Sequence, residues 1–426
     1  MRVDPVSSLR GALAVPGDKS VSHRAVLFGA LADGETVARG FGASQDTLST
    51  ASAMRALGAR VDVEGDVVRV VGVGLRGLRA PGGPVDCGNA GTLMRLLAGV
   101  LAGQEGRFTL TGDESLSRRP LERIAAPLRL MGATIETTEG HAPLTVEGGG
   151  LAPIRYESPV ASAQVKSCVL LAGMLAADGP TTVVEPAPTR DHTERMLRAA
   201  GVRVEARGTE VSIWPAERLA PLDLDVPGDF SSAAPFLAAA TMLSGSDVVL
   251  QGVGVNPTRI GFLHVLERMG ARIAVFNRRT EGGEPVADLQ VGSAELTATE
   301  VTPDEVPLLI DELPLFALVA SMARGTSVVR GAEELRVKET DRIDAVSAAL
   351  RAVGGHIDPT PDGFRVRGVP SRLRGGTVDS AGDHRIAMVG ALAGLMSREG
   401  VEVRGAEWVS VSFPGFYDVL GSLAVR

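Results

Sequence analysis

A short pattern that recurs six times limits the folds open to this chain of 426 residues. In each copy a helix-like stretch ends in an apolar residue, a glycine follows, and a β-prone run comes next. A glycine there is typical of a helix end in the left-handed conformation, and the alternating apolar run after it predicts a strand. The spacing of roughly 70 residues is too long for a common solenoid and indicates six compact α/β modules. The glycines are Gly58, Gly132, Gly201, Gly270, Gly354 and, in a degraded copy, Gly421.

A second, longer repeat contains the first. Val15-Pro16-Gly17-Asp18 recurs as Val226-Pro227-Gly228-Asp229, and each copy leads into an apolar, helix-like stretch. The interval between them holds three modules, so the chain divides into two similar halves of three modules each. Pro and Gly punctuate the chain at these two crossovers. A cleft between two halves is a common place for a ligand.

Composition excludes several classes of protein. The formal charge of −8 argues against broad nucleic-acid binding, although a small anion can still bind in a locally basic cleft. Only Cys87 and Cys168 are cysteines and no CxxC pair occurs, so we expect neither a metal site nor a disulfide framework. The N-terminus has no apolar core of a signal peptide, and no apolar run is long enough to span a bilayer. We therefore expect a soluble cytoplasmic protein without membrane or nucleic-acid partners.

Lysine is rare among the 43 basic residues: only Lys19, Lys166 and Lys338 occur. Biased codon usage explains most of this. In a chain that otherwise uses arginine, however, a remaining lysine can do what arginine cannot, because its pKa can be shifted. All three lysines lie in polar clusters.

Basic or hydroxyl-bearing turns open helix-like stretches in module after module. Each turn alone is explained about as well by an ordinary capped helix or a solvated loop. For His192 we expect a capping or surface position, but Arg190 beside it is a candidate for anion binding. Together, helix N-termini that converge on one cleft would attract anions strongly. The turns lie at 16–24, 88–95, 117–121, 161–167, 189–193 and 383–388.

Acidic residues in two further segments are candidates for proton transfer. Asp311 and Glu312 interrupt an apolar stretch at 306–319, and five of the seven side chains at 336–342 can carry charge. Burying a charge is costly unless it is paired, and an acid in an apolar setting can exchange protons. The plainer alternatives are a helix-start Asp before Pro314 and a surface helix at 336–342. With Asp311 and Glu339 in an anion-binding cleft, the chain would handle a multiply negative ligand without metal or organic cofactor. The glycines at 72–77 fit G-x-G-x-x-G, but no helix-like stretch follows, so a dinucleotide site is not expected.

In family order and across essentially the whole chain, these segments resemble the signatures of the 5-enolpyruvylshikimate-3-phosphate (EPSP) synthase family. The segments at 162–167 and 189–194 are similar to its bacterial class II branch. The resemblance implies an α/β fold of two similar domains, each of three repeated βαβαββ-type units, with the active site in the interdomain cleft. It implies a first domain at 13–225 and a second at 1–12 plus 226–426. The segments that carry it are Pro16 to Ser20, Gly88 to Thr92, Arg119-Pro120, Ser162 to Gln164, Arg336 to Arg342 and Asp383 to Arg385.

The resemblance also implies an activity. The family transfers the enolpyruvyl group of phosphoenolpyruvate to the 5-hydroxyl of shikimate 3-phosphate and releases phosphate by addition and elimination, in the pathway to aromatic amino acids. No cofactor is implied, and we expect a monomer. Residues implied to hold shikimate 3-phosphate are Lys19, Ser20, Arg24, Ser162, Ala163, Gln164 and Arg190, with Asp311 and Lys338 on its ring hydroxyls. Residues implied to hold phosphoenolpyruvate are Lys19, Gly91, Arg119, Arg342 and Arg385, with Asn89, Thr92 and His384 as nearby supports. Asp311 and Glu339 are the candidates for proton transfer, with Lys19 assisting.

The chain departs from the family at two positions. Val411 stands where many relatives have a lysine that contacts phosphoenolpyruvate, and Glu334 stands where many have an asparagine that contacts the other substrate. Gly91 is similar to members whose phosphoenolpyruvate pocket admits the herbicide glyphosate, so inhibition is expected.

Two other functions stay open. One is the sister enolpyruvyl transferase that acts on UDP-N-acetylglucosamine, which typically uses a loop cysteine as an acid. Neither Cys87 nor Cys168 lies in a comparable glycine-rich loop. The other is a non-catalytic anion-binding module.

Overall fold

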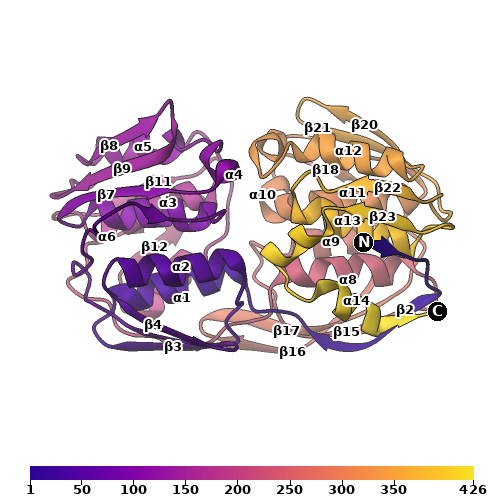
Figure 1. Ribbon diagram of the computed structural model, residues 1–426, viewed down its shortest axis with the longest axis horizontal. Helices are drawn as coiled ribbons and strands as arrows, with labels where there is room; N and C mark the ends of the chain where they lie inside the picture. Colours follow the sequence, from indigo (N-terminus) through magenta and orange to yellow (C-terminus); the bar gives the residue numbers. More distant parts are fainter. The chain divides into compact units, whose positions relative to one another are not determined.

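The computed structural model describes residues 1–426, which divide into two compact units (Figure 1). The N-terminal unit comprises Gly17–Pro227 together with the short segment Thr280–Glu284. The C-terminal unit comprises Met1–Pro16, Gly228–Arg279 and Pro285–Arg426. Each unit has a hydrophobic core of its own. The α/β fold of two units built from repeats is therefore confirmed.

Three four-stranded sheets form the N-terminal unit, and all three share one topology. The first two strands in each order are parallel, and the remaining neighbours are antiparallel. In spatial order the sheets are β14 (Asp223–Asp225), β3 (Glu35–Arg39), β5 (Val67–Val71) and β4 (Arg60–Glu64); β6 (Val85–Asp86), β7 (Gly106–Thr111), β9 (His141–Gly148) and β8 (Thr134–Thr138); and β10 (Arg155–Glu157), β11 (Thr181–Val184), β13 (Glu210–Ile213) and β12 (Val204–Arg207).

The C-terminal unit repeats this plan with one sheet extended and one shortened. Its sheets are β16 (Arg272–Glu281), β17 (Glu284–Gly292), β15 (Asp247–Gly254), β2 (Ser8–Ala14) and β24 (Ala424–Val425); β18 (Glu300–Val301), β19 (Gly325–Val329), β21 (Gly363–Gly368) and β20 (His356–Thr360); and β1 (Arg2–Val3), β23 (Val401–Arg404) and β22 (Gly376–Asp379). Strands β2 and β1 come from the start of the chain, which belongs to this unit.

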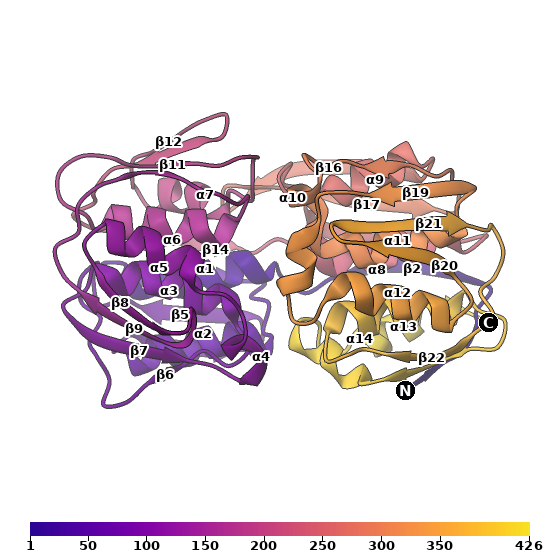
Figure 2. The same ribbon diagram turned by 90° about the horizontal axis from the view of Figure 1, so that it is seen from above.

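Six helices whose residues are nearly all buried fill the two cores, three in each unit (Figure 2). They lack an exposed polar face, as expected of helices that are packed on all sides. The inner helices of the N-terminal unit are α1 (Lys19–Leu31), α3 (Gly91–Ala102) and α6 (Ala163–Met174), and those of the C-terminal unit are α8 (Phe230–Met242), α11 (Leu313–Met322) and α13 (His384–Leu395).

The remaining helices have one polar face or are short. Five of them end just before a repeat glycine whose φ lies between 89° and 107°, the left-handed conformation expected of a helix end; Gly421, in the degraded copy, does not adopt it. These five are α2 (Gln45–Ala56), α5 (Glu122–Leu130), α7 (His192–Ala199), α9 (Gly261–Arg268) and α12 (Arg342–Ala352). The others are α4 (Glu114–Ser117), α10 (Val306–Leu309), α14 (Phe416–Leu423) and the 3₁₀ helices η1 (Ile310–Glu312), η2 (Glu333–Val337) and η3 (Ala406–Val411).

Aspartates cap α1 and α8 at the two Val-Pro-Gly-Asp segments. Asp18 accepts a hydrogen bond from the Val21 N–H, and Asp229 accepts one from the Ser231 N–H. Gly17 has no room for a side chain, because a Cβ there would lie 1.8 Å from the carbonyl oxygen of Gly40. The sequence repeat thus reflects a packed turn that starts the first inner helix of each half.

No helix is long and apolar enough to cross a membrane.

Candidate active site

The first polar cluster of the N-terminal unit lies at the start of α1. Lys19 is the first residue of the helix, and its Nζ lies 2.8 Å from Asp46 Oδ2. Ser20 follows and is partly exposed. The Lys19 side chain is 26% exposed, so the ammonium group remains within reach of a ligand while Asp46 orients it. A helix N-terminus with an adjacent cation suits an anion.

Arg24 lies one turn further along α1 and is buried. Its guanidinium donates to the Ser20 carbonyl at 2.9 Å, to Thr193 Oγ1 at 2.8 Å and to Ser167 Oγ at 3.1 Å. These bonds join the starts of α1, α6 and α7. The pKa of Arg24 is lowered to about 10, mainly by burial and also by the nearby charge of Arg190, while Glu194, Asp18 and Glu284 act in the opposite sense. Arg24 and Arg190 therefore lie close enough for their like charges to interact.

A second cluster forms where α3 begins. Arg119 Nη2 donates to Asn89 Oδ1 at 2.6 Å, and Asn89 donates in turn to Asp113. A Cβ on Gly91 would lie 2.9 Å from Arg95 Nη1 and 3.1 Å from Arg119 Nη1. Two guanidinium groups therefore converge over a residue without a side chain, an arrangement that suits a carboxylate or a phosphate.

The start of α6 is joined to α3 through an amide. Arg95 Nη1 donates to Gln164 Oε1 at 2.6 Å, and Gln164 Nε2 donates to Thr92 Oγ1 at 2.9 Å. Ser162 caps α6, and Ala163 is its first residue. Gln164 is thus held by its neighbours on α3 at the helix start.

Lys166 is a buried structural residue. Its Nζ lies 2.9 Å from Glu185 and 2.9 Å from Glu194, with all three side chains at most 3% exposed. Burial lowers the pKa of Lys166, but the charges of Glu194 and Glu185 outweigh it and hold the pKa above its ordinary value. The ammonium group also donates to the Thr189 carbonyl at 3.3 Å, which fixes the segment ahead of Arg190.

His192 corrects our expectation of a capping or surface side chain. It is 3% exposed, and its Nδ1 lies 2.8 Å from Oε1 of Glu284, which is itself buried. Glu284 lies 92 residues away in the sequence, so no local pattern around His192 could indicate the contact.

Arg342 organises the cluster of the C-terminal unit. It is buried and donates to Asp383 Oδ2 at 2.7 Å, to Glu339 Oε2 at 2.6 Å and to Asp311 Oδ1 at 3.3 Å. Burial alone would lower its pKa, but the charges of Asp383, Glu339 and Asp311 raise it above the ordinary value. The interpretation of 336–342 as a surface helix is wrong, because α12 begins only at Arg342, where Asp341 caps it.

Glu312, next to Asp311, is fully buried and orients a second arginine. The Ser231 hydroxyl donates to Glu312 Oε1, and Arg385 Nη1 donates to the same oxygen at 3.4 Å. His384 and Arg385 are the first residues of α13, and Asp383 caps that helix through the Arg385 N–H. Arg342 and Arg385 are therefore each held by a carboxylate from another element.

Three residues that shape these clusters lie outside every segment named from the sequence: Asp46, Asp113 and Glu284. Arg95, Glu312 and Asp383 lie within predicted segments. The partners of Lys19 and His192 are distant in the sequence. Val411, at the position of the family's lysine, is buried at the end of η3, and Glu334 lies partly exposed in η2. No group of His, Cys, Asp or Glu side chains could hold a metal ion.

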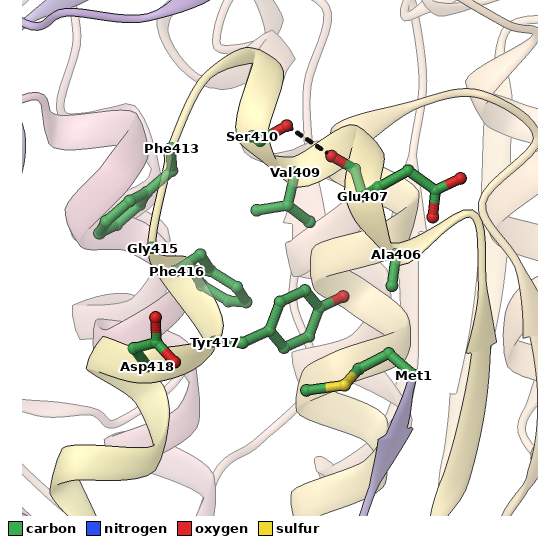
Figure 3. Close-up of a pocket in the computed structure, with 10 residues that line it drawn as sticks. All are labelled: Met1, Ala406, Glu407, Val409, Ser410, Phe413, Gly415, Phe416, Tyr417 and Asp418. Carbon is green, nitrogen blue, oxygen red and sulfur yellow. Dashed lines mark hydrogen bonds between the residues drawn. The ribbon is translucent and has the colours of Figure 1, made fainter.

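A pocket of about 380 Å³ opens elsewhere in the C-terminal unit, between η3, α14 and Met1 (Figure 3). Phe413, Phe416 and Tyr417 form its apolar wall, and Glu407 and Asp418 stand at its edge. No lysine or arginine lines it, and none of the residues chosen from the sequence does. It does not suit a ligand with several negative charges.

Comparisons with known proteins agree with one another over the full length. The family model of EPSP synthase (3-phosphoshikimate 1-carboxyvinyltransferase) matches residues 3–420. A 3-phosphoshikimate 1-carboxyvinyltransferase of Geobacter sp. (strain M21) is 49% identical over 426 residues, 100% of this chain and 99% of the relative. One of Bacillus licheniformis is 46% identical over 428 residues and covers 100% of both chains.

Solved structures give the same result for the fold. An EPSP synthase from Acinetobacter baumannii superposes with a TM-score of 0.88 at 45% identity, covering 100% of this chain and 98% of the other. The enolpyruvyl transferase NikO from Streptomyces tendae superposes with a TM-score of 0.80 at 20% identity, covering 99% and 96%. The second likeness bears on the fold alone.

Proposed function

Because the chain belongs to the EPSP synthase family, we propose that it transfers the enolpyruvyl group of phosphoenolpyruvate to the 5-hydroxyl of shikimate 3-phosphate and releases phosphate. One observation supports the proposal most directly. Arginines at helix starts are held by buried carboxylate or hydroxyl partners, and these arginines lie on motifs that match the family. The proposal requires the clusters of both units to act on the same pair of substrates.

We assign shikimate 3-phosphate first to the starts of α1 and α6. Arg24 is buried beside the charge of Arg190, and such a pair of cations gains from a shared anion. Lys19 and Ser20 lie at the N-terminus of α1, where free N–H groups favour a phosphate. Ser162, Ala163 and Gln164 open α6, and we assign Asp311 and Lys338 to the ring hydroxyls.

Phosphoenolpyruvate is assigned to arginines from both units. Arg119 converges over Gly91 with Arg95, and Arg342 and Arg385 are oriented by Asp383 and Glu312. Guanidinium groups bind carboxylate and phosphate bidentately, and both groups are present in this substrate. Asn89, which receives the Arg119 hydrogen bond, Thr92, which receives one from Gln164, and His384 at the start of α13 act as supports. Lys19 completes the proposed set.

The mechanism is an addition followed by an elimination. Protonation of the phosphoenolpyruvate methylene makes the neighbouring carbon electrophilic, and the 5-hydroxyl attacks that carbon as it loses its proton. The tetrahedral intermediate then loses a proton from its new methyl group and expels phosphate. Glu339 and Asp311 are the proposed proton-transfer groups, because Arg342 holds the carboxylates of both. Lys19 assists by balancing the charge that develops.

Transfer to UDP-N-acetylglucosamine is not favoured. Cys87 and Cys168 are both fully buried, which raises the pKa of each thiol, that of Cys168 to about 12. Neither thiol is placed to protonate a substrate.

Phosphate release tests the proposal. The purified protein is mixed with phosphoenolpyruvate and shikimate 3-phosphate, and a parallel reaction contains UDP-N-acetylglucosamine instead. Release only with shikimate 3-phosphate is expected. Release only with the nucleotide sugar would assign the protein to the sister activity, and binding of both substrates without release would leave a non-catalytic anion-binding module.

We further propose that the enzyme is a cytoplasmic monomer. The absence of a membrane-spanning helix is compatible with that location. Light scattering during size-exclusion chromatography is expected to give a mass near 44.1 kDa, and fractionation of the source cells tests the location.

A further inference from the structure

The hairpin of β16 and β17 supplies five residues to the N-terminal unit, although its strands belong to the other unit. Its turn is Gly282-Gly283, with φ of 56° and 82°, the conformation of a two-residue turn that requires positive φ at both positions. The turn packs closely, since a Cβ on Gly282 would lie 3.2 Å from Leu224 Cβ. The Gly283 carbonyl accepts a hydrogen bond from Arg195 Nη1 at 3.3 Å.

The first residue after this turn, Glu284, buries its carboxylate. It is 2% exposed, and its Oε1 lies 2.8 Å from His192 Nδ1. An ionised carboxylate can only accept a hydrogen bond, so Nδ1 carries the proton and donates it. Arg195 Nε lies 4.0 Å from the other oxygen, Oε2. Two side chains of α7 thus hold the hairpin tip.

These contacts bear on the first turn of α7, which carries part of the proposed substrate site. No side chain caps this helix through its N-cap residue, Asp191. Thr193 receives the Arg24 Nε–H at 2.8 Å and lies 2.7 Å from Ser167 Oγ. Arg190 directly precedes the N-cap. His192, between Arg190 and Thr193, is the residue that Glu284 fixes.

The charge of Glu284 also acts within this site. Together with Glu194 and Asp18 it raises the pKa of Arg24, whereas Arg190 lowers it. A negative charge near two like cations reduces their mutual repulsion. This electrostatic effect agrees with the geometry, which places the carboxylate beside the helix start.

We propose that Glu284 is a positioning residue for the phosphorylated substrate: by holding His192 it fixes the first turn of α7, and thereby Arg190 and the Thr193 hydroxyl that orients Arg24. This inference rests on the proposed function, in which Arg24 and Arg190 help to hold shikimate 3-phosphate. Glu284, which belongs to the N-terminal unit, then determines substrate affinity at a site that the same unit carries.

Steady-state kinetics of Glu284→Ala test the proposal. Loss of a hydrogen bond to a charged group is expected to raise KM for shikimate 3-phosphate about tenfold. The KM for phosphoenolpyruvate is expected to stay within about twofold of the wild-type value, because Glu284 does not hold the residues assigned to that substrate. Glu284→Gln is expected to restore most of the affinity, since its amide oxygen still accepts from Nδ1. Arg278→Ala, an exposed change on the same hairpin, serves as the matched control and should leave both KM values unchanged.

A calorimetric titration with shikimate 3-phosphate measures the same effect without turnover. The Kd of Glu284→Ala is expected to rise by the same factor as its KM. Inactive wild-type protein that still binds shikimate 3-phosphate would refute the proposed function and leave this inference testable by binding. Active wild-type protein combined with an unchanged Kd in Glu284→Ala, or with equal rises in both KM values, would overturn the inference.

A second variant covers the case in which Glu284→Ala does not fold. His192→Phe combined with Glu284→Gln removes both the hydrogen bond and the buried charge while keeping the side-chain volumes. Its KM for shikimate 3-phosphate is expected to rise selectively, as in Glu284→Ala. An unchanged KM in this folded double variant would refute the positioning role.

Discussion

Replacing Lys166 by methionine tests the energetics of the N-terminal unit most directly. The substitution keeps an unbranched side chain of similar length and removes the charge between Glu185 and Glu194, whose side chains are each 2% exposed. Breaking a buried ion pair by removing one partner costs about 3–5 kcal/mol, because a charge is left uncompensated. For a unit of this size each kcal/mol lowers Tm by roughly 2–4 °C, so a fall of about 6–20 °C is expected.

The pH dependence separates this cause from simple loss of packing. In the wild type the pKa of Lys166 is raised above 10.5, so its contribution is fully present at neutral pH and is lost only as the pH rises through the raised value. In the variant, burial without a neighbouring cation disfavours the ionised form of the Glu185 and Glu194 carboxylates. Such a group destabilises the fold increasingly as the pH rises, so the deficit is expected to be larger at pH 8 than at pH 5.5.

The assay uses the two tryptophans, one in each unit. Trp214 lies in the N-terminal unit with the Arg203 guanidinium 3.8 Å from its ring centroid, and Trp408 lies in the C-terminal unit. In a Trp408→Phe background, fluorescence therefore reports thermal unfolding of the N-terminal unit alone. Arg155→Met, which breaks the exposed pair with Glu210 in the same unit, is the matched control and should cost at most about 1 kcal/mol.

Two results would refute the reasoning. A Tm that falls equally at pH 8 and pH 5.5 would mean that packing, not stranded charge, accounts for the loss. A Tm of Lys166→Met within 2 °C of the wild type would mean that the triad contributes little. Adding Glu185→Gln and Glu194→Gln to Lys166→Met is expected to recover much of the loss, because a neutral triple variant leaves no buried charge.

Three further predictions concern the active site. Gly91→Ala is expected to weaken glyphosate inhibition and to raise KM for phosphoenolpyruvate by about tenfold or more. The reason is that the new Cβ would lie 2.9 Å from one guanidinium nitrogen and 3.1 Å from another. Equal inhibition of wild type and variant in a phosphate-release assay would contradict this. Glu339→Gln is expected to lower kcat about 10²–10⁴-fold with an unchanged Tm, because the variant lacks a proton-transfer group. A kcat within threefold of the wild type would remove Glu339 from the mechanism. Cys87 and Cys168 are expected to resist alkylation in the native protein at pH 8, since burial raises the pKa of both thiols; rapid labelling measured by mass spectrometry, with loss of activity, would contradict their burial.

Local patterns determined the modular plan of this chain. The glycines after each helix-like stretch predicted helix ends, and five of them adopt the positive φ that such ends require. The two Val-Pro-Gly-Asp segments predicted a helix-like stretch after each of them, and Asp18 and Asp229 cap the first inner helix of each half there. These features can be predicted from the sequence because a helix end depends on the few residues around it.

The sequence also indicated most of the residues that gather at helix starts, because motif residues lie close together along the chain. Arg119 and Asn89 illustrate what the motifs leave undecided. Both belong to recognised segments, but their hydrogen bond joins residues 30 positions apart. The motif indicates the residue types, and the packing of α3 against its neighbours sets their geometry.

Only the tertiary structure decided which charges are paired. His192 was expected in a capping or surface position and is buried against Glu284. A surface helix was the plainer alternative for 336–342, but Arg342 is buried among three carboxylates. The cost of burying a charge depends on partners brought close by the whole fold. Glu284, Asp311 and Asp383 each lie tens of residues away from the side chain that they contact. The sequence by itself therefore determined the modules and the residue types of the site, while packing decided which side chains became buried, oriented and charged.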